Sequence, residues 1–250
     1  MSTAAVNIAV QNSIELIDWS QVRSVYRKLH TDFHVLTKPF GIEISEQMNQ
    51  DLAHLISLID AVDRDLDELN QFADRQTFGR SVVAFLKGDI TEIETATVSK
   101  ELALRLSFLR EIVVRRNIAD NFAKAVDAIF EHTEAKRQTS DSNEMLKHLT
   151  VEGWYTGRLP ILVLNEHSNA GFEKFFYLFC ELMTVVDMIQ DAHADYRNDE
   201  IIVRPDVTLY GKLMATFVLT LPKLFYRFPS PLKLVKYCLS FLYELYVKRV

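Results

Sequence analysis

The sequence predicts an all-α protein, and two observations carry that prediction. The 250 residues include only 7 glycines and 6 prolines, too few for the many turns of an all-β fold. Apolar residues recur almost throughout at intervals of three and four, which is the period of one face of a helix. Hydrophobic residues make up 48% of the chain, enough for a sizeable core. We therefore expect one helical domain spanning residues 1–250.

Charge and cysteine content limit the partners and the compartment. A net charge of −6 and a pI near 5.7 argue against general nucleic-acid binding, which needs a basic surface. Cys180 and Cys238 lie in apolar helical patterns, which indicates buried free thiols in a reducing compartment. The N-terminal stretch MSTAAVNIAVQNSIELIDW lacks the basic start and the apolar run of a signal peptide. We expect a cytoplasmic protein.

The first half of the chain reads as a series of amphipathic helices. Apolar spacing predicts helices over about 18–36, from about 45 into the acidic run DAVDRDLDEL, and over 77–88, 99–116 and 118–134. Pro39 and Gly41 end the first helix, and Gly88 ends the third. The polar run AKRQTSDSNE, residues 135–144, is predicted to be a loop.

The acidic run at the end of the second helix has two interpretations. Asp60, Asp63 and Asp67 fall at i, i+3 and i+7 and therefore share one face. Such a run is most often a solvated helix face. Two features favour a site instead, because Asp60 follows a strongly apolar stretch and a second acidic stripe occurs later in the chain.

A helix beginning near Glu144 reaches an irregular point at GWYTGRLP. Gly153 and Gly157 allow either close approach of a neighbouring backbone or a break in the helix, and Pro160 disfavours continuation. Arg158 at this point is a candidate anion contact. The aromatic side chains that follow, in residues 172–179, are either plain core or the lining of a pocket.

The second acidic stripe lies in MTVVDMIQDAHADYRNDEIIVRP, residues 183–205. Read as a helix, this stretch places Asp187, Asp191 and Asp195 at i, i+4 and i+8, on one side of successive turns. Like charges at this spacing destabilise a helix by roughly 0.2–0.5 kcal/mol per pair. A divalent cation such as Mg²⁺, which prefers carboxylate oxygens, is the simplest counter-charge.

Beyond Pro205 the chain is apolar again, but neither half reaches the roughly 20 clean apolar residues of a membrane span. Lysines and arginines among the aromatics allow peripheral membrane contact, as for an interfacial helix. An ordinary terminal core helix is the other reading.

The stripe resembles a known motif. MIQDAHADYRNDEIIVRP is similar to the second aspartate-rich motif of squalene and phytoene synthases, in which Asn, Asp and Asp at this spacing precede a basic residue and an apolar stretch ending in Pro. Here those places hold Asp187, Asp191, Asp195, Arg197 and residues 201–205. The spacing also resembles the second metal motif of class I terpene synthases, and YELYVKRV is similar to the end of a phytoene synthase.

DAVDRD lies about where these families carry their first aspartate-rich helix. The resemblance there is partial, because Arg64 stands where an aspartate is expected four residues after Asp60. Asp63 is the alternative ligand.

The resemblance implies an isoprenoid synthase bundle with a central apolar cavity and two acidic helices facing each other across its mouth. It further implies Mg²⁺ between these helices and a prenyl diphosphate, and the implied residues fall into four groups. Metal ligands are Asp60, Asp63, Asp187, Asp191 and Asp195, with Asp60, Asp191 and Asp195 catalytic. Diphosphate contacts are Arg197 and Arg158, and cavity liners are Trp154, Tyr155, Phe172, Phe175, Phe176 and Phe179.

The expected activity is a Mg²⁺-dependent class I terpene synthase that ionises an allylic prenyl diphosphate and cyclises or rearranges the cation. A prenyltransferase joining two prenyl diphosphates is the alternative. A non-catalytic helical partner with a decayed first motif is a further one. A di-iron oxidase is disfavoured because paired Glu-x-x-His motifs are not visible. Substrate length, and the choice between monomer and homodimer, stay open.

Overall fold

The computed structural model describes residues 17–67, 69, 72–93 and 98–247 of the chain. Within these ranges every regular element is a helix and no strand occurs, so the all-α prediction is confirmed. Residues 1–16 and 248–250, which carry most of the signal-peptide argument and the last part of YELYVKRV, lie outside them. The α-helices are α2 (Ser24–Thr37), α3 (Glu46–Asp67), α4 (Phe72–Lys87), α5 (Lys100–Arg115), α6 (Ala119–Gln138), α7 (Ser142–Leu164), α8 (Ala170–Arg197), α9 (Val207–Arg227) and α10 (Pro231–Val247).

The chain forms two compact units. Unit 1 comprises Met1–Asp120 with Leu232–Val250, and unit 2 comprises Asn121–Pro231. The expectation of one domain over residues 1–250 stays a prediction.

Unit 1 is built around α3. Leu52, Leu55 and Ile56 of this helix are fully buried, and α3 packs against both α2 and α5. The first helix begins later than the apolar spacing predicts. The Asp18 carboxylate accepts hydrogen bonds from the backbone N–H and the hydroxyl of Ser20, at 3.0 and 2.6 Å. These bonds fix a turn before α2 starts.

Glycines end two segments of unit 1 as predicted. Gly41 and Gly88 adopt φ values of 73° and 88°, the left-handed region that glycine enters without steric cost. Gly88 donates its N–H to the carbonyl of Ala84 at 3.1 Å and thereby closes α4.

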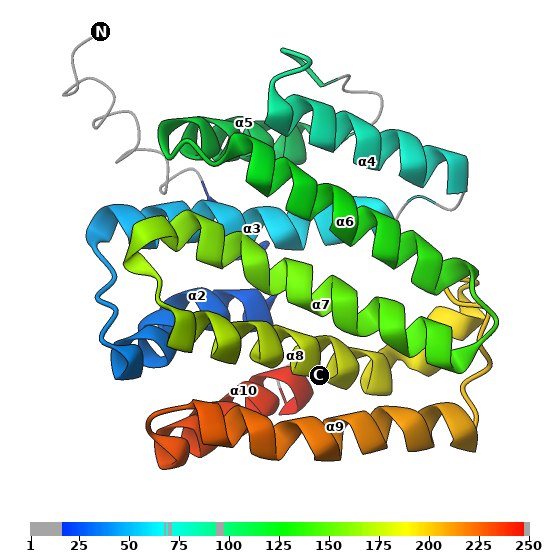
Figure 1. Cartoon of the computed structure of the whole chain (residues 1–250). Coiled ribbons are helices and arrows are strands. Elements are labelled where there is room, and N and C mark those ends of the chain that lie inside the picture. The colour runs from blue at the N-terminus through cyan, green and yellow to red at the C-terminus, as the bar shows by residue number, and fades with distance from the viewer. Residues whose placement is uncertain (1–16, 68, 70–71, 94–97, 248–250) are drawn as a thin grey trace, which may run out of the picture. The chain divides into compact units, whose positions relative to one another are not determined.

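Unit 2 contains nearly all of α6 together with α7, α8 and α9. In Figure 1, α7 and α8 lie side by side, and α9 lies along α8. Part of the core between these three helices consists of Met145, Leu149, Val185, Met188, Ala192, Leu209 and Leu213.

The connection between α6 and α7 is shorter than the predicted loop over 135–144. Helix α6 continues to Gln138, because Ala, Lys, Arg and Gln are good helix formers. Helix α7 begins at Ser142, and the Asp141 side chain caps it by accepting hydrogen bonds from the N–H groups of Asn143 and Glu144, at 2.6 and 3.2 Å.

Helix α7 also runs through Pro160 to Leu164. Of the two readings of Gly153 and Gly157, the break is wrong and the close approach is confirmed. A Cβ on Gly153 would lie 2.8 Å from the Cα of Glu181 and 2.9 Å from the carbonyl oxygen of Cys180. One on Gly157 would lie 3.2 Å from the Cys180 sulfur.

Cys180 and Cys238 are free thiols that are partly buried. Burial raises the pKa of both thiols, that of Cys238 to about 11. Neither is therefore a reactive thiolate near neutral pH. None of the described helices combines the length and the apolar character that crossing a bilayer requires.

Candidate functional site

The acidic stripe of Asp187, Asp191 and Asp195 lies on α8, as the spacing predicts. The Asn169 side chain caps this helix by accepting hydrogen bonds from the N–H groups of Gly171 and Phe172. Asp187 is exposed, whereas Asp191 and Asp195 are half-buried. The helix ends at Arg197, so the rest of the stretch to residue 205 is not helical.

Asp195 is in an unfavourable electrostatic environment. Burial raises the pKa of its carboxyl group to about 7, and repulsion from Glu200, Asp191 and Asp187 adds to the effect. Lys136 opposes the rise but does not cancel it. The positive charge near Asp195 therefore does not offset its burial and the neighbouring acids, and this is a condition that favours binding of an added cation.

Two basic residues that sequence reasoning missed lie beside the stripe. Lys136 forms an ion pair with Glu152 of α7 at 2.8 Å. Burial lowers the pKa of Lys136, but Glu152 and, more weakly, Asp187 outweigh burial and raise it above its ordinary value. Arg137 lies 4.0 Å from Glu200. Both lie in the run that the sequence assigned to a loop, so their position on α6, beside acids of α8, was not predicted.

A histidine pair joins the same two helices. The Nδ1 atoms of His132 on α6 and His148 on α7 are 2.8 Å apart, so one imidazole donates and the other accepts. Burial, followed by the neighbouring His148, lowers the pKa of His132. The Tyr155 ring stacks on His132 with 6.2 Å between the ring centroids.

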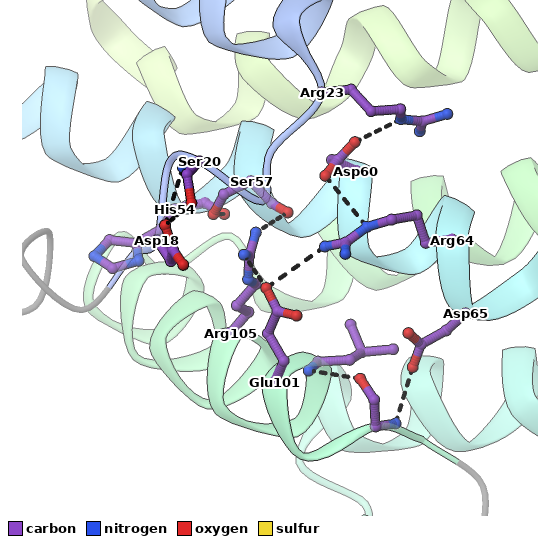
Figure 2. Close-up of polar contacts among 12 residues, drawn as sticks. Asp18, Ser20, Arg23, His54, Ser57, Asp60, Arg64, Asp65, Glu101 and Arg105 are labelled. Atoms are coloured by element: carbon purple, nitrogen blue, oxygen red, sulfur yellow. Dashed lines mark hydrogen bonds and ion pairs between the residues drawn. The ribbon is translucent and has the colours of Figure 1, made fainter.

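In unit 1, the first-motif acid Asp60 is already paired with arginines. Its side chain is fully buried, and Arg23 Nε donates to Asp60 Oδ1 at 2.6 Å. Arg64 Nε lies 3.4 Å from the other oxygen, as an ion pair without hydrogen-bond geometry. Asp63 accepts a hydrogen bond from the same Arg23 guanidinium. Figure 2 shows Arg23 and Arg64 reaching Asp60 from opposite sides.

The network continues from Arg64 to α5. Glu101 contacts Arg64 at 3.5 Å and is also bound by Arg105, whose guanidinium donates to the Ser57 carbonyl at 2.5 Å (Figure 2). The Arg64 that departs from the family pattern is thus an ion-pair partner of both Asp60 and Glu101. The Asp67 side chain lies outside the described part of the structure.

The two arginines predicted to bind diphosphate, Arg158 and Arg197, make their described contacts away from the acidic stripe. The Arg158 guanidinium lies over the Trp154 ring, 5.5 Å from its centroid. Arg197 Nε donates to the His193 carbonyl of its own helix at 3.3 Å. Arg197 is two residues beyond Asp195, so it projects from the opposite side of α8.

The predicted aromatic liners separate into two groups. Phe172, Phe175, Phe176 and Phe179 are at most 4% exposed and pack ring against ring, with 5.2 Å between the centroids of Phe172 and Phe176. Trp154 and Tyr155 are partly buried and meet edge to face at 4.8 Å. The four phenylalanines therefore belong to the packed interior of unit 2.

The two acidic clusters differ in how well they fit Mg²⁺. Among the described side chains, no three His, Cys, Asp or Glu groups converge closely enough to hold a metal as they stand. The α8 stripe fits in its chemistry, because it offers hard oxygen donors whose mutual repulsion a cation would relieve. Asp60 does not fit while Arg23 and Arg64 already neutralise it.

Comparisons with protein-family models, with curated proteins and with solved structures found no match for this chain.

Proposed function

We propose that the chain is a Mg²⁺-dependent class I isoprenoid synthase. It ionises an allylic prenyl diphosphate, releases diphosphate, and cyclises or rearranges the resulting cation; joining two prenyl diphosphates is the alternative reaction. The observation that carries the proposal is the α8 stripe, where burial and neighbouring acids raise the pKa of Asp195 to about 7. A helix that retains such a repulsive row beside a basic pair is suited to binding a metal and an anion together.

In this proposal Asp187, Asp191 and Asp195 would hold Mg²⁺, which when bound neutralises charge on the departing diphosphate. Lys136 and Arg137 are additional candidates for the diphosphate oxygens, because they lie beside these acids and donate charged hydrogen bonds. Arg158 and Arg197 stay as candidates from the family resemblance. Of the predicted aromatic liners, Trp154 and Tyr155, which are only partly buried, would help to exclude water from the cation.

Asp60 and Asp63 have a conditional role. Both carboxylates bind Arg23, so either can serve as a metal ligand only after that guanidinium moves away. The catalytic assignment of Asp60 therefore depends on Arg23 being displaced when substrate binds.

The test is pyrophosphate release from geranyl, farnesyl and geranylgeranyl diphosphate, each alone with Mg²⁺, followed by product analysis. Release from a single substrate with a terpene product supports the proposal, whereas a coupled product supports the prenyltransferase. Asp191→Asn should lower release by at least about 100-fold. Asp127→Asn, an exposed acid on α6, is the matched control. No release above background from any substrate would refute the proposal.

A non-catalytic helical partner is the second candidate, and the arginine pairing of Asp60 favours it. Such a protein would bind a Mg²⁺–diphosphate complex without turning it over. Calorimetry with Mg²⁺ and a prenyl diphosphate, in parallel with the release assay, separates the two: heat without pyrophosphate release identifies a binding protein.

A further inference from the structure

Helix α9 is apolar on two opposite sides. Leu209, Leu213 and Leu224 are at most 1% exposed and pack into the interior. Large apolar side chains also project outward from this helix. Their exposed fractions are 89% for Val207, 46% for Met214, 57% for Val218, 68% for Leu219 and 92% for Tyr226.

The exposed side chains form a continuous stripe. Val207, Gly211, Met214, Val218 and Pro222 follow at intervals of four and three, so they lie above one another on successive turns. Leu219 and Tyr226 widen the stripe along one edge. Single exposed apolar residues need no explanation, but a contiguous patch of this kind marks an interaction surface.

Charge indicates what the surface contacts. From Val207 to Tyr243 the sequence has five basic residues and no aspartate or glutamate, in a chain whose net charge is −6. On a helical wheel Lys212 and Lys223 border the stripe next to Leu219; Lys223 is exposed, whereas Lys212 donates a hydrogen bond to the Ser142 hydroxyl at 2.6 Å. A negatively charged partner would therefore be attracted to this helix and repelled by much of the rest of the chain.

An open hollow adjoins the N-terminal end of the stripe. Its volume is about 630 Å³, and Val207, Gly211 and Met214 line it together with His193, Arg204 and Tyr210. Asp206 also lines the hollow, but its carboxylate accepts a hydrogen bond from the Leu209 N–H and caps α9. The apolar stripe thus ends beside an exposed guanidinium, which suits a phosphate group at the edge of an apolar layer.

We infer that α9 lies flat on an anionic lipid bilayer, with its exposed stripe in the interface and Lys223 and Arg204 toward lipid phosphates. A helix with one apolar face and basic borders binds in this way. A second copy of the chain is the weaker occupant, because pairing α9 with itself would bring basic edges of like charge together. This inference is independent of the proposed enzymatic activity.

The test is flotation of the full chain with vesicles, without prenyl diphosphate. Vesicles of phosphatidylcholine with about 30% phosphatidylglycerol should bind roughly tenfold or more tightly than phosphatidylcholine alone, and 0.5 M salt should weaken binding. Val218→Asp with Leu219→Asp should reduce binding roughly tenfold or more, because apolar side chains leave the interface and charges enter it. Leu104→Asp with Val114→Asp, at exposed apolar positions of α5, is the matched control and should bind like wild type.

Electrostatic attraction is tested separately. Lys223→Gln should weaken vesicle binding about fivefold. Lys124→Gln, at an exposed position of α6, should leave binding unchanged. Circular dichroism and light scattering accompany every variant. Equal binding by the α9 and α5 double variants would overturn the inference. The inference would also be overturned if the wild-type protein did not bind anionic vesicles. A third contrary outcome is a wild-type dimer that Val218→Asp with Leu219→Asp dissociates while vesicle binding stays unchanged.

Discussion

At Gly153 the backbones of α7 and α8 approach so closely that any side chain must displace main-chain atoms. A Cβ there would lie 2.8 Å from the Cα of Glu181, and neither helix can yield without losing packing. We expect Gly153→Ala to lower the free energy of unfolding by about 1–3 kcal/mol. Urea denaturation monitored by circular dichroism measures the change.

Gly211→Ala is the matched control, because it lies within α9 and a Cβ there meets nothing within 4 Å. Alanine restricts the unfolded chain and favours the helix, so this variant should gain about 0.4–1 kcal/mol. Equal effects of the two substitutions would show that the close approach at Gly153 has no energetic consequence.

Asp60 and Asp195 should respond in opposite ways to the same substitution. Asp60 is fully buried between two arginines, and asparagine would remove the buried charge that both guanidinium groups share, leaving Arg23 with Asp63 and Arg64 with Glu101. Because these arginine side chains are 39% and 34% exposed, water offsets part of the loss. We expect Asp60→Asn to lower the free energy of unfolding by about 1–3 kcal/mol, again by urea denaturation.

Asp195→Asn removes repulsion within the α8 stripe, because Glu200, Asp191 and Asp187 all disfavour its charged form. Without Mg²⁺ it should stabilise the protein by about 0.2–0.5 kcal/mol, while abolishing pyrophosphate release. Gain of stability with loss of activity is the expected signature of a functional site. A destabilisation as large as that of Asp60→Asn would instead assign the stripe a structural role.

At the scale of the element, the contribution of α8 to the free energy of unfolding should fall as pH rises. The folded-state pKa of Asp195 is about 7, against an ordinary value of 3.8, so between these values the folded state binds the proton more tightly than the unfolded state. This group's stabilisation is complete below its unfolded pKa and is lost as pH rises through about 7. Denaturation without Mg²⁺ across this range should show the decline.

Asp195→Asn isolates that contribution. His132, whose pKa is lowered, favours the opposite trend, so the informative quantity is wild type minus variant at each pH. A difference that does not change with pH would contradict the raised pKa. Mg²⁺ binding should strengthen as pH rises through about 7, because the ligand must be deprotonated.

The difference between the α8 stripe and Asp60 shows which parts of the site the sequence could predict. The α8 stripe depends on spacing within one helix, which periodicity reports directly. Asp60 depends on Arg23, 37 residues away, and no local pattern shows that the two meet. Helix α7 continues through Pro160 because it is packed closely on α8, and this tertiary contact overrides the local preference. Lys136 was missed because polar composition suggested a loop where the residues are good helix formers.

At the scale of the whole molecule, the proposed ligand set should localise to unit 2. Mg²⁺ with inorganic pyrophosphate at about 100 times its dissociation constant would stabilise the folded state by about 2.7 kcal/mol. A rise in melting temperature is the first readout. Asp191→Asn should not show it, whereas Asp127→Asn should.

Hydrogen exchange then shows where the ligand acts. Slower exchange is expected in α8 and in the last turns of α6, where Lys136 and Arg137 lie, because binding to the stripe holds these segments closed. Helix α4, in unit 1, serves as the internal reference. Protection confined to α3 would instead place the ion at Asp60 and Asp63, where it would have to displace Arg23. A uniform rise in protection without local maxima would indicate nonspecific ionic stabilisation. Either outcome would contradict α8 as the metal-binding helix.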